Sequence, residues 1–251
     1  MLNNWELIWA LALKELRIRY KRSALGFLWA LLNPLLMLVI LTVVFSTIAR
    51  LSVDKYAVFL ISALLPWTFF SQTLSYSTES LVGNGELLKK VQVDKTVFPF
   101  AAVISNLINF LLSLVPLALI LLALRFPFHW TWIYLPVPLL GLVLFTIGCS
   151  LFCAASNVFF RDVGHIVQIV LMGWFYLSPI IYPLEFIPQR YRLVLRLNPL
   201  VYILHGFRLA IYNGQLPSAQ SAILSVAVGL VAATLGYLFF RRVQWKLVYY
   251  V

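Results

Sequence analysis

Charged residues are scarce in this chain of 251 residues. They make up only 11% of it, and just 8 are acidic, whereas 63% of the residues are hydrophobic. Globular domains carry about 25% charged residues, and the mean hydropathy of +0.95 is also well above what such domains show. The composition therefore excludes an ordinary soluble domain and predicts an integral membrane protein.

Catalytic and ion-coupling motifs are also missing. The sequence has no Gly-x-x-x-x-Gly-Lys phosphate loop, no His-Glu-x-x-His zinc motif and no paired aspartates for a magnesium diphosphate. All 8 acidic residues lie at the ends of predicted spans or in connections, whereas carriers driven by ion gradients place carboxylates or broken helices near the bilayer centre. We therefore predict no catalytic residue, metal or cofactor in this chain, and energy for uphill transport would come from a partner.

Long apolar runs are what the sequence does contain. Six of them reach the roughly 20 residues that a membrane-spanning helix needs: 28–49, 57–78, 98–124, 134–157, 166–183 and 219–240. An even number of spans places both termini on one side of the membrane. That side carries 12 Lys and Arg residues against 7 on the other, which predicts cytoplasmic termini. The net charge of +11 then reflects topology and not binding to nucleic acid.

The connection before the last span, residues 184–218, departs from this charge pattern. It is too long for a turn and too apolar for a flexible loop, and Pro188, Pro199 and Gly206 interrupt its helical spacing. We interpret it as short helices that dip back into the outer leaflet. Its arginines are predicted to meet anionic groups, either lipid phosphates or a substrate diphosphate. They are Arg190, Arg192, Arg196 and, as the strongest candidate, Arg208.

The N-terminal segment, residues 1–22, has a different pattern. Five basic residues crowd into 14–22, and the stretch 24–49 that follows carries no charge. Apolar and polar side chains fall on opposite faces of a helix, with Leu7 and Leu11 among the exceptions. The apolar face holds Trp5, Ile8, Trp9, Ala12, Leu13, Leu16 and Tyr20. We interpret the segment as an amphipathic interface helix in the headgroup plane; the alternative is a solvated basic tail that only sets topology.

Four stretches form a recognisable series along the chain. They are RYKRSALGFLWALLNPLL at 19–36, SLVGNGELLKKV at 80–91, FRDVGHIVQIVLMGWFYLSPIIYP at 160–183 and NPLVYILHGFR at 198–208. In order and at the expected intervals they resemble the transmembrane subunit of ABC-2 type polysaccharide exporters, which export O-antigen, capsular polysaccharide and teichoic acid. The resemblance implies a permease that dimerises and binds two copies of a separate ATPase, which holds ATP and Mg. It also implies an all-α, type V exporter-like fold with six transmembrane helices, an interface helix and re-entrant helices.

The connection 79–97 is predicted to contain the main ATPase contact. After the breaker at 83–85 it carries a short amphipathic turn, which the resemblance identifies as a coupling helix that moves spans two and three. An ordinary charged loop is the alternative. The coupling residues are Glu86, Leu87, Lys89, Lys90 and Asp94. The family's Phe-Pro usually follows the basic pair closely and is followed by Arg-Glu, whereas residues 92–97 are inserted here and no Arg-Glu follows.

The short connection FFRDVGH, residues 159–165, places Arg161 beside Asp162 at the predicted cytoplasmic end of span four. One interpretation is a second, smaller ATPase contact. The other is an ion pair in which Asp162 caps the N-terminus of the next helix, and the two roles are compatible.

Aromatic residues gather in the fifth span and at neighbouring positions. Such rings pack on the C–H faces of sugars and tolerate sliding, because no single contact is strong. The predicted substrate path consists of Trp174, Phe175, Tyr176, Tyr182, Trp29, Trp67 and Phe70. An aromatic belt at the membrane interface is the alternative, and it applies best to Trp29 and Tyr182, which lie near span ends.

Small residues recur at helical spacing in spans four and six. Span four contains GCSLFCAAS at 148–156, and span six contains Gly229, Ala232, Ala233 and Gly236. This pattern predicts that the helices pack closely. The two cysteines, Cys149 and Cys153, are interpreted as small packing residues and not as a redox pair or metal site.

These features together predict the membrane-spanning subunit of an ATP-driven exporter of a polyprenyl-lipid-linked, O-antigen-like polysaccharide. The chain would lie in the bacterial cytoplasmic (inner) membrane and would not itself be an enzyme. Its partners would be a second copy of itself, two ATPase subunits and membrane lipids. The alternatives are an ABC-2 permease for a teichoic acid, a drug or a smaller lipid, and a membrane-embedded polyprenyl-phosphate transferase, which would need acidic metal ligands in pairs.

Overall fold

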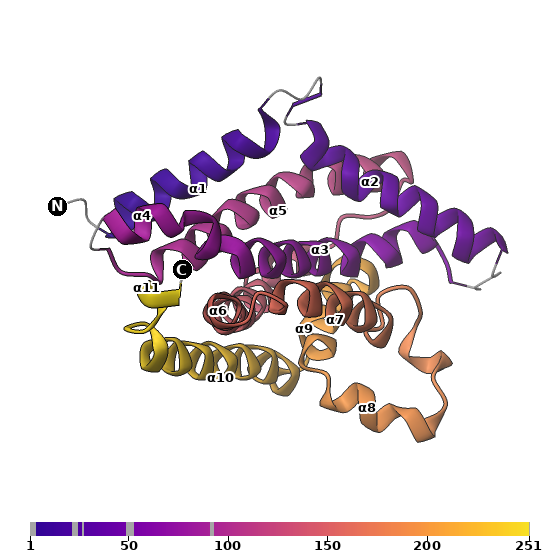
Figure 1. The fold of residues 1–251 in the computed structure, drawn as a ribbon. Helices are drawn as coiled ribbons and strands as arrows, with labels where there is room; N and C mark the ends of the chain where they lie inside the picture. The colour runs from indigo at the N-terminus through magenta and orange to yellow at the C-terminus, as the bar shows by residue number, and fades with distance from the viewer. Residues whose placement is uncertain (1–3, 22–24, 27, 49–52, 91–92, 251) are drawn as a thin grey trace.

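The computed structural model describes residues 4–21, 25–26, 28–48, 53–90 and 93–250. Within these ranges all regular elements are helical, as predicted (Figure 1). The long helices are α1 (Asn4–Tyr20), α2 (Leu28–Thr42), α3 (Tyr56–Ser80), α5 (Val97–Ala123), α6 (Pro136–Phe159), α7 (Val163–Leu177) and α10 (Ala219–Val243). The short α-helices are α4 (Gly85–Lys90), α8 (Arg192–Leu197), α9 (Pro199–Arg208) and α11 (Leu247–Tyr250). The 3₁₀ and π-helical turns are η1 (Val43–Ile48), η2 (Val82–Asn84), η3 (Trp130–Tyr134), η4 (Leu184–Phe186), η5 (Gln189–Tyr191) and η6 (Leu209–Asn213).

Four helices in the described ranges are long and apolar enough to cross a membrane, namely α3, α5, α6 with η3, and α10. Two shorter apolar helices, Leu32–Ser46 and Val163–Leu177, occupy the predicted first and fifth spans. A helix of 15 residues such as α7 rises only about 22 Å, less than the roughly 30 Å of a hydrocarbon core. The all-helical, multi-pass architecture is thus confirmed, while the count of six spans stays a prediction.

Helix α3 forms the centre of the bundle. In its most apolar stretch 78% of the residues are buried, against 22% for α10. Helices α2, α5, α6, α7 and α9 all pack against α3, and Leu60, Leu64 and Phe70 are among its most deeply buried side chains. Helix α10 instead exposes an apolar surface along most of its length, which suits contact with lipid.

Helices α6 and α10 form the most extensive helix pair. Gly141 and Gly148 of α6 face Gly229 and Gly236 of α10. A Cβ atom at Gly148 would overlap the carbonyl group of Ala232, and one at Gly236 would overlap the carbonyl group of Gly148. The backbones therefore approach too closely for any side chain between them. This confirms the predicted close packing of spans four and six through small residues.

The fifth predicted span, 166–183, is helical only as far as Leu177, where α7 stops. Ser178 precedes Pro179 and is extended, with φ −103° and ψ 141°, since a following proline disfavours helical backbone. Pro179 also lacks the N–H that a continuing helix would use. Residues 178–183 form a turn, so the aromatic helix is shorter than the sequence predicts.

The connection 184–218 contains two short α-helices, as its sequence predicts. Asn198 separates α8 from α9, and its side chain accepts a hydrogen bond from the backbone N–H of Leu200 at 3.1 Å, an N-cap. Pro199 takes the first position of α9, where its missing N–H leaves no bond unmade. Gly214, with φ of 65°, follows η6. Re-entry of these helices into the membrane stays a prediction.

Helix α1 confirms the predicted N-terminal helix but divides its faces differently. Leu11 and Ala12 are buried and Leu7 packs beside them, because α1 lies against α5. Trp5 and Trp9 are 61% and 45% exposed, although the amphipathic pattern places them on the same face as Ala12. The protein-facing side thus includes Leu7 and Leu11, which are exceptions in that pattern.

The segments predicted to be cytoplasmic gather at one end of the bundle. In Figure 1 the start of α1, the short helix α4 and the C-terminal α11 lie together, while α8 lies at the opposite end. A second hydrophobic cluster joins them, with Leu88 from α4, Phe98 from α5, Phe240 from α10 and Leu247 from α11. This arrangement agrees with termini that share one side of the membrane.

Replacing Gly148 by alanine is expected to lower the thermal unfolding temperature of the detergent-purified protein. The added methyl group overlaps the Ala232 carbonyl, and overpacking costs about 1–3 kcal/mol. Gly173→Ala is the matched control, since a Cβ atom there meets nothing within 4 Å and alanine favours a helix. Differential scanning fluorimetry would measure both. Equal melting temperatures for the two variants would contradict the close α6–α10 contact.

Candidate functional site

A groove of about 380 Å³ lies between α2, α3 and α7. Helix α2 contributes Asn33 and Met37, α3 contributes Ser71 and Gln72, and α7 contributes Tyr176. The lining therefore combines an aromatic ring with amide and hydroxyl groups on an otherwise apolar wall. We call this hollow the aromatic groove.

The predicted path residues fall into an open group and a packed group. Tyr176 and Trp29 are 59% and 44% exposed. Phe70 is fully buried, and Trp67 and Phe175 are only 6% and 9% exposed. Trp67 lies 5.8 Å from Phe70 and 5.7 Å from Phe175 between ring centroids, and parts of Trp67 and Phe175 line the groove. Among the predicted path residues, Tyr176 and Trp29 are thus the two with the most exposed rings.

Trp174 links α7 to the connection 184–218. Its indole Nε1 donates a hydrogen bond to Oδ1 of Asn198 at 2.9 Å, and its ring meets Phe70 and Phe145 edge-on at 5.4 and 6.0 Å. Asn198 in turn donates from Nδ2 to the Ser178 hydroxyl at 3.0 Å. The ring of Trp174 is packed and its N–H is hydrogen-bonded. Trp174 therefore stabilises the fold in the first place, and a role in the substrate path comes second.

Tyr182 also serves the local structure. Its hydroxyl donates to the carbonyl of Tyr176 at 2.6 Å, one of the carbonyls left free where α7 ends. The hydroxyl of Tyr56 donates to the carbonyl of Ile181 at 2.7 Å. Both bonds fix the turn that follows α7, so Tyr182 positions the end of the aromatic helix.

Arg208 occupies the same turn from the other side. Its Nη1 and Nη2 donate to the carbonyls of Pro179 and Ile180 at 2.6 and 3.0 Å, and its guanidinium carbon lies 3.8 Å from the centre of the Phe59 ring. The side chain is 8% exposed. Arg208 therefore anchors α9 to the break after α7, and we do not carry it forward as a contact for anionic ligands.

The other arginines of the connection 184–218 differ from Arg208 in exposure. Arg190 and Arg192 are exposed. The Arg190 guanidinium lies 4.6 Å from the Tyr191 ring centre, and Arg192 Nε donates to the Ile187 carbonyl at 3.4 Å. The side chain of Arg196 lies outside the described part of the structure. Arg190 and Arg192 are thus placed to meet anionic groups, which stays a prediction.

The predicted coupling residues lie on α4, directly after the Gly-Asn-Gly breaker. Leu88 is buried and Leu87 is half-buried, so the second hydrophobic cluster holds α4 against the bundle. Glu86, Lys89 and Lys90 are exposed. The Lys90 Nζ and Glu86 Oε2 atoms lie 3.7 Å apart, a surface pair of little energetic weight. Helix α4 therefore presents charges outward from an apolar anchor, as a docking helix would.

Asp94 lies in the inserted stretch, of which residues 91–92 are outside the described structure. Its Oδ1 accepts hydrogen bonds from the backbone N–H and the hydroxyl of Thr96 at 3.0 and 2.8 Å, an Asx turn. The described part of the insertion is thus a turn that leads into α5. Asp94 remains exposed and keeps a free carboxylate edge.

Asp162 occupies the N-cap position of α7, as the sequence predicts, but it does not cap the helix through its side chain. Its side chain makes no capping bond to α7, and it forms no ion pair with Arg161 in the described part of the chain. The backbone N–H of Gly164 instead donates to Asn157 Oδ1 at 3.0 Å, and Asn157 Nδ2 donates to the carbonyl of Thr78 at 3.0 Å. Asn157 thus fixes this corner, and the exposed Arg161 and Asp162 are available for a partner.

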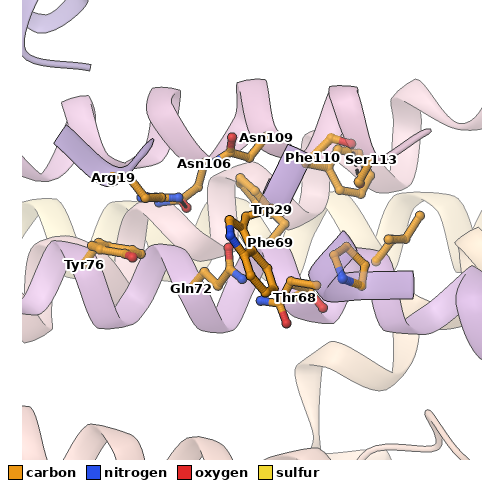
Figure 2. A pocket seen from close by; sticks show the side chains of 13 residues that line it. Arg19, Trp29, Thr68, Phe69, Gln72, Tyr76, Asn106, Asn109, Phe110 and Ser113 are labelled. Atoms are coloured by element: carbon orange, nitrogen blue, oxygen red, sulfur yellow. Dashed lines mark hydrogen bonds between the residues drawn. The ribbon is translucent and has the colours of Figure 1, made fainter. Parts of the chain in front are cut away.

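A polar cavity of about 290 Å³ lies between α2, α3 and α5, at the end of α1 (Figure 2). Arg19 of α1 lines it. The Arg19 Nη1 donates to Oδ1 of Asn106 at 3.0 Å, and the guanidinium carbon lies 3.9 Å from the centre of the Tyr76 ring. Nε and Nη2 of Arg19 are buried and have no hydrogen-bond partner among the described residues. We call this hollow the Arg19 cavity.

None of the polar residues of the Arg19 cavity was among the predicted site residues. Along α5 and α3 they recur every three or four positions: Asn106, Asn109 and Ser113, and Thr68, Gln72 and Tyr76. A polar stripe at helical spacing in an apolar helix is costly in hydrocarbon and marks a wet or functional surface, so the signal is present in the sequence. Asn33 and Pro34 of α2 line both this cavity and the aromatic groove.

Comparisons with known proteins agree with this architecture. The chain is 35% identical to the O-antigen export system permease protein RfbA of Myxococcus xanthus, over 90% of this chain and 87% of that protein. It is 30% identical to a protein of the same name from Klebsiella pneumoniae, over 96% and 93%, and 26% identical to the polysialic acid transport protein KpsM of Escherichia coli, over 92% and 91%. The family model of the ABC-2 type transporter matches residues 6–212, from α1 to η6. The chain therefore belongs to the ABC-2 type transporter family.

Proposed function

We propose that this chain is the permease subunit of an ATP-driven exporter of a lipid-linked polysaccharide in the bacterial cytoplasmic membrane. The observation that carries the proposal is similarity to O-antigen export permeases over nearly the whole chain. The aromatic groove supports it, because ring faces next to amides and hydroxyls suit the C–H faces and hydroxyl groups of a glycan. A permease for a teichoic acid, a drug or a smaller lipid is the alternative.

ATP hydrolysis belongs to a separate subunit in this proposal, and that subunit holds ATP and Mg. Its docking surface is the exposed face of α4 together with Arg161 and Asp162. Both termini then face the cytoplasm, α2 and α7 count as the first and fifth of six spans, and two ATPase copies bind a permease dimer. Because α4 lies between α3 and α5 in the chain, ATPase closure moves these two helices.

The path for the polymer forms where two copies of the chain meet along the aromatic groove. Helices α2 and α7 both expose large apolar side chains beside it, among them Met37 and Met172. Tyr176 of both copies then lines the path, and Trp29 reaches it from the adjoining Arg19 cavity. At its outer end α8 and α9 re-enter the leaflet, and Arg190 and Arg192 meet lipid phosphates there.

Replacing Glu86, Lys89 and Lys90 together by alanine is expected to reduce export at least tenfold without unfolding the protein. These groups are exposed on α4, and surface substitutions usually change stability by less than about 0.5 kcal/mol. Surface glycan and copurified ATPase would be quantified in cells that express each variant. Arg242→Ala with Lys246→Ala is the control, since both residues are exposed near the C-terminus. Normal export by the triple variant at normal expression would argue against coupling through α4.

Tyr176→Ala is expected to shorten the exported polymer or stop its export, because stacking of roughly 1 kcal/mol per ring recurs at every sugar. The melting temperature should stay unchanged, because the ring is exposed. Tyr176→Phe should restore export, and Leu177→Ala, also exposed, is the matched control. Trp174→Ala should instead lower the melting temperature, because it removes the bond to Asn198. Full-length glycan exported at the parental rate by Tyr176→Ala would exclude this ring from the path.

A further inference from the structure

Arg19 is a half-buried cation at the end of α1, beside the apolar helices of the bundle. A guanidinium carries five N–H donors, yet one hydrogen bond, from Nη1 to Asn106, is present among the described residues. No acidic side chain lines the Arg19 cavity in the described part of the chain. Burying a cation whose donors are unpaired costs free energy, so the side chain is poorly satisfied by the protein alone.

The cavity around Arg19 is shaped for an amphiphilic guest. Along α3 it extends from Tyr76 to Leu65, a rise of roughly 16 Å in an α-helix. The end at Arg19 is polar, with Gln72 nearby, whereas the far end is walled by Leu65 and Phe110 with the single hydroxyl of Ser113 beside them. Figure 2 shows Arg19 and Tyr76 at one end of this hollow and Phe110 toward the other. A charged head fits beside Arg19, with less polar atoms extending deeper.

Neighbouring charges on α1 favour an anionic guest. Lys14, Arg17 and Lys21 line a hollow on the outer side of α1, and such a basic surface concentrates anionic lipids. Glu15 lies one turn before Arg19. Burial raises the pKa of the Glu15 carboxyl to about 7, against the lowering effect of Arg19 and Lys14. Near neutral pH Glu15 is therefore only partly ionised, and it offsets the charge of Arg19 only in part.

We propose that the Arg19 cavity binds the phosphate group of a lipid, of the diphosphate class that joins a polysaccharide to its carrier. The guanidinium fork matches two phosphate oxygens at once, and the amides of Gln72 and Asn33 supply further donors. The inference rests on the proposed function and deepens it, since it names where the head group of the exported lipid docks. Because Asn33 and Pro34 line both hollows, the bound head group lies one helix away from the aromatic groove.

The test uses the full chain in nanodiscs of neutral lipid, with farnesyl diphosphate as the ligand. We expect it to raise the melting temperature of the parent and of Arg242→Gln, an exposed arginine near the C-terminus, and to bind Arg19→Gln at least tenfold more weakly. Farnesol, which lacks phosphate, should give no shift. Inorganic diphosphate should bind at least tenfold more weakly than the lipid. Equal binding of farnesyl diphosphate to Arg19→Gln and Arg242→Gln would overturn the site, and equal binding of inorganic diphosphate and farnesyl diphosphate to the parent would overturn its assignment to a lipid.

Stability without ligand separates a binding role from a structural one. If Arg19 is held for a ligand, Arg19→Gln should melt at the parental temperature or above, because two unpaired donors are removed. A lower melting temperature with ligand binding intact would make Arg19 a structural anchor for Asn106 and Tyr76 and overturn the proposal. Asn33→Leu keeps Arg19 but makes the exposed wall apolar, and it should weaken binding several-fold; unchanged binding would also count against the site.

This measurement needs neither ATPase nor glycan, so its failure is distinct from failure of the proposed function. If the parent does not bind the lipid but still exports polymer, the proposed Arg19 site is wrong and the proposed exporter function stands. If the protein binds the diphosphate through Arg19 but exports no polymer, the proposed site stands and the proposed polysaccharide substrate is wrong.

Discussion

Polar groups buried among apolar helices must find hydrogen-bond partners within the protein. In this protein, side chains form hydrogen bonds with backbone groups at the places where helices begin or end. Arg208 donates to the two carbonyls that follow the end of α7. Asn198 caps α9 and also holds Trp174 of α7. Asn157 of α6 fixes the corner to α7 and the carbonyl of Thr78 in α3. These side chains determine where α7 begins and ends, and so where the aromatic groove lies.

Arg19 departs from this rule. Arg208 pairs both Nη atoms with carbonyls and leaves Nε unpaired, whereas Arg19 leaves both Nε and Nη2 without a partner among the described residues. A protein retains such an unsatisfied group most readily where a ligand completes it, since strained or unpaired groups concentrate at functional sites. The glycine contact between α6 and α10 gives the bundle a rigid side opposite this more open one.

Much of the fold follows from local sequence, because a span is recognised by its own length and apolarity. All six predicted spans contain apolar helices, and the small residues of spans four and six do pack closely. The sequence predicts less where contacts with a distant segment determine the local structure. The face of α1 is set by α5, the corner at Asp162 is fixed by Asn157, and Trp174 is packed by Asn198. Periodicity of one helix carries no information on these partners, although the polar stripe of α5 was visible in the sequence.

ATP-driven passage of a polymer is the central property proposed for this chain. It is tested most directly in proteoliposomes that contain the purified chain together with the ATPase that copurifies with it, loaded with a lipid-linked glycan longer than the bilayer is thick. We predict that ATP moves the glycan to the opposite side, that the chain alone hydrolyses no ATP, and that vesicles without the ATPase move nothing. Transport of a short fluorescent lipid but not of the glycan, or ATP hydrolysis by the chain alone, would contradict the assignment.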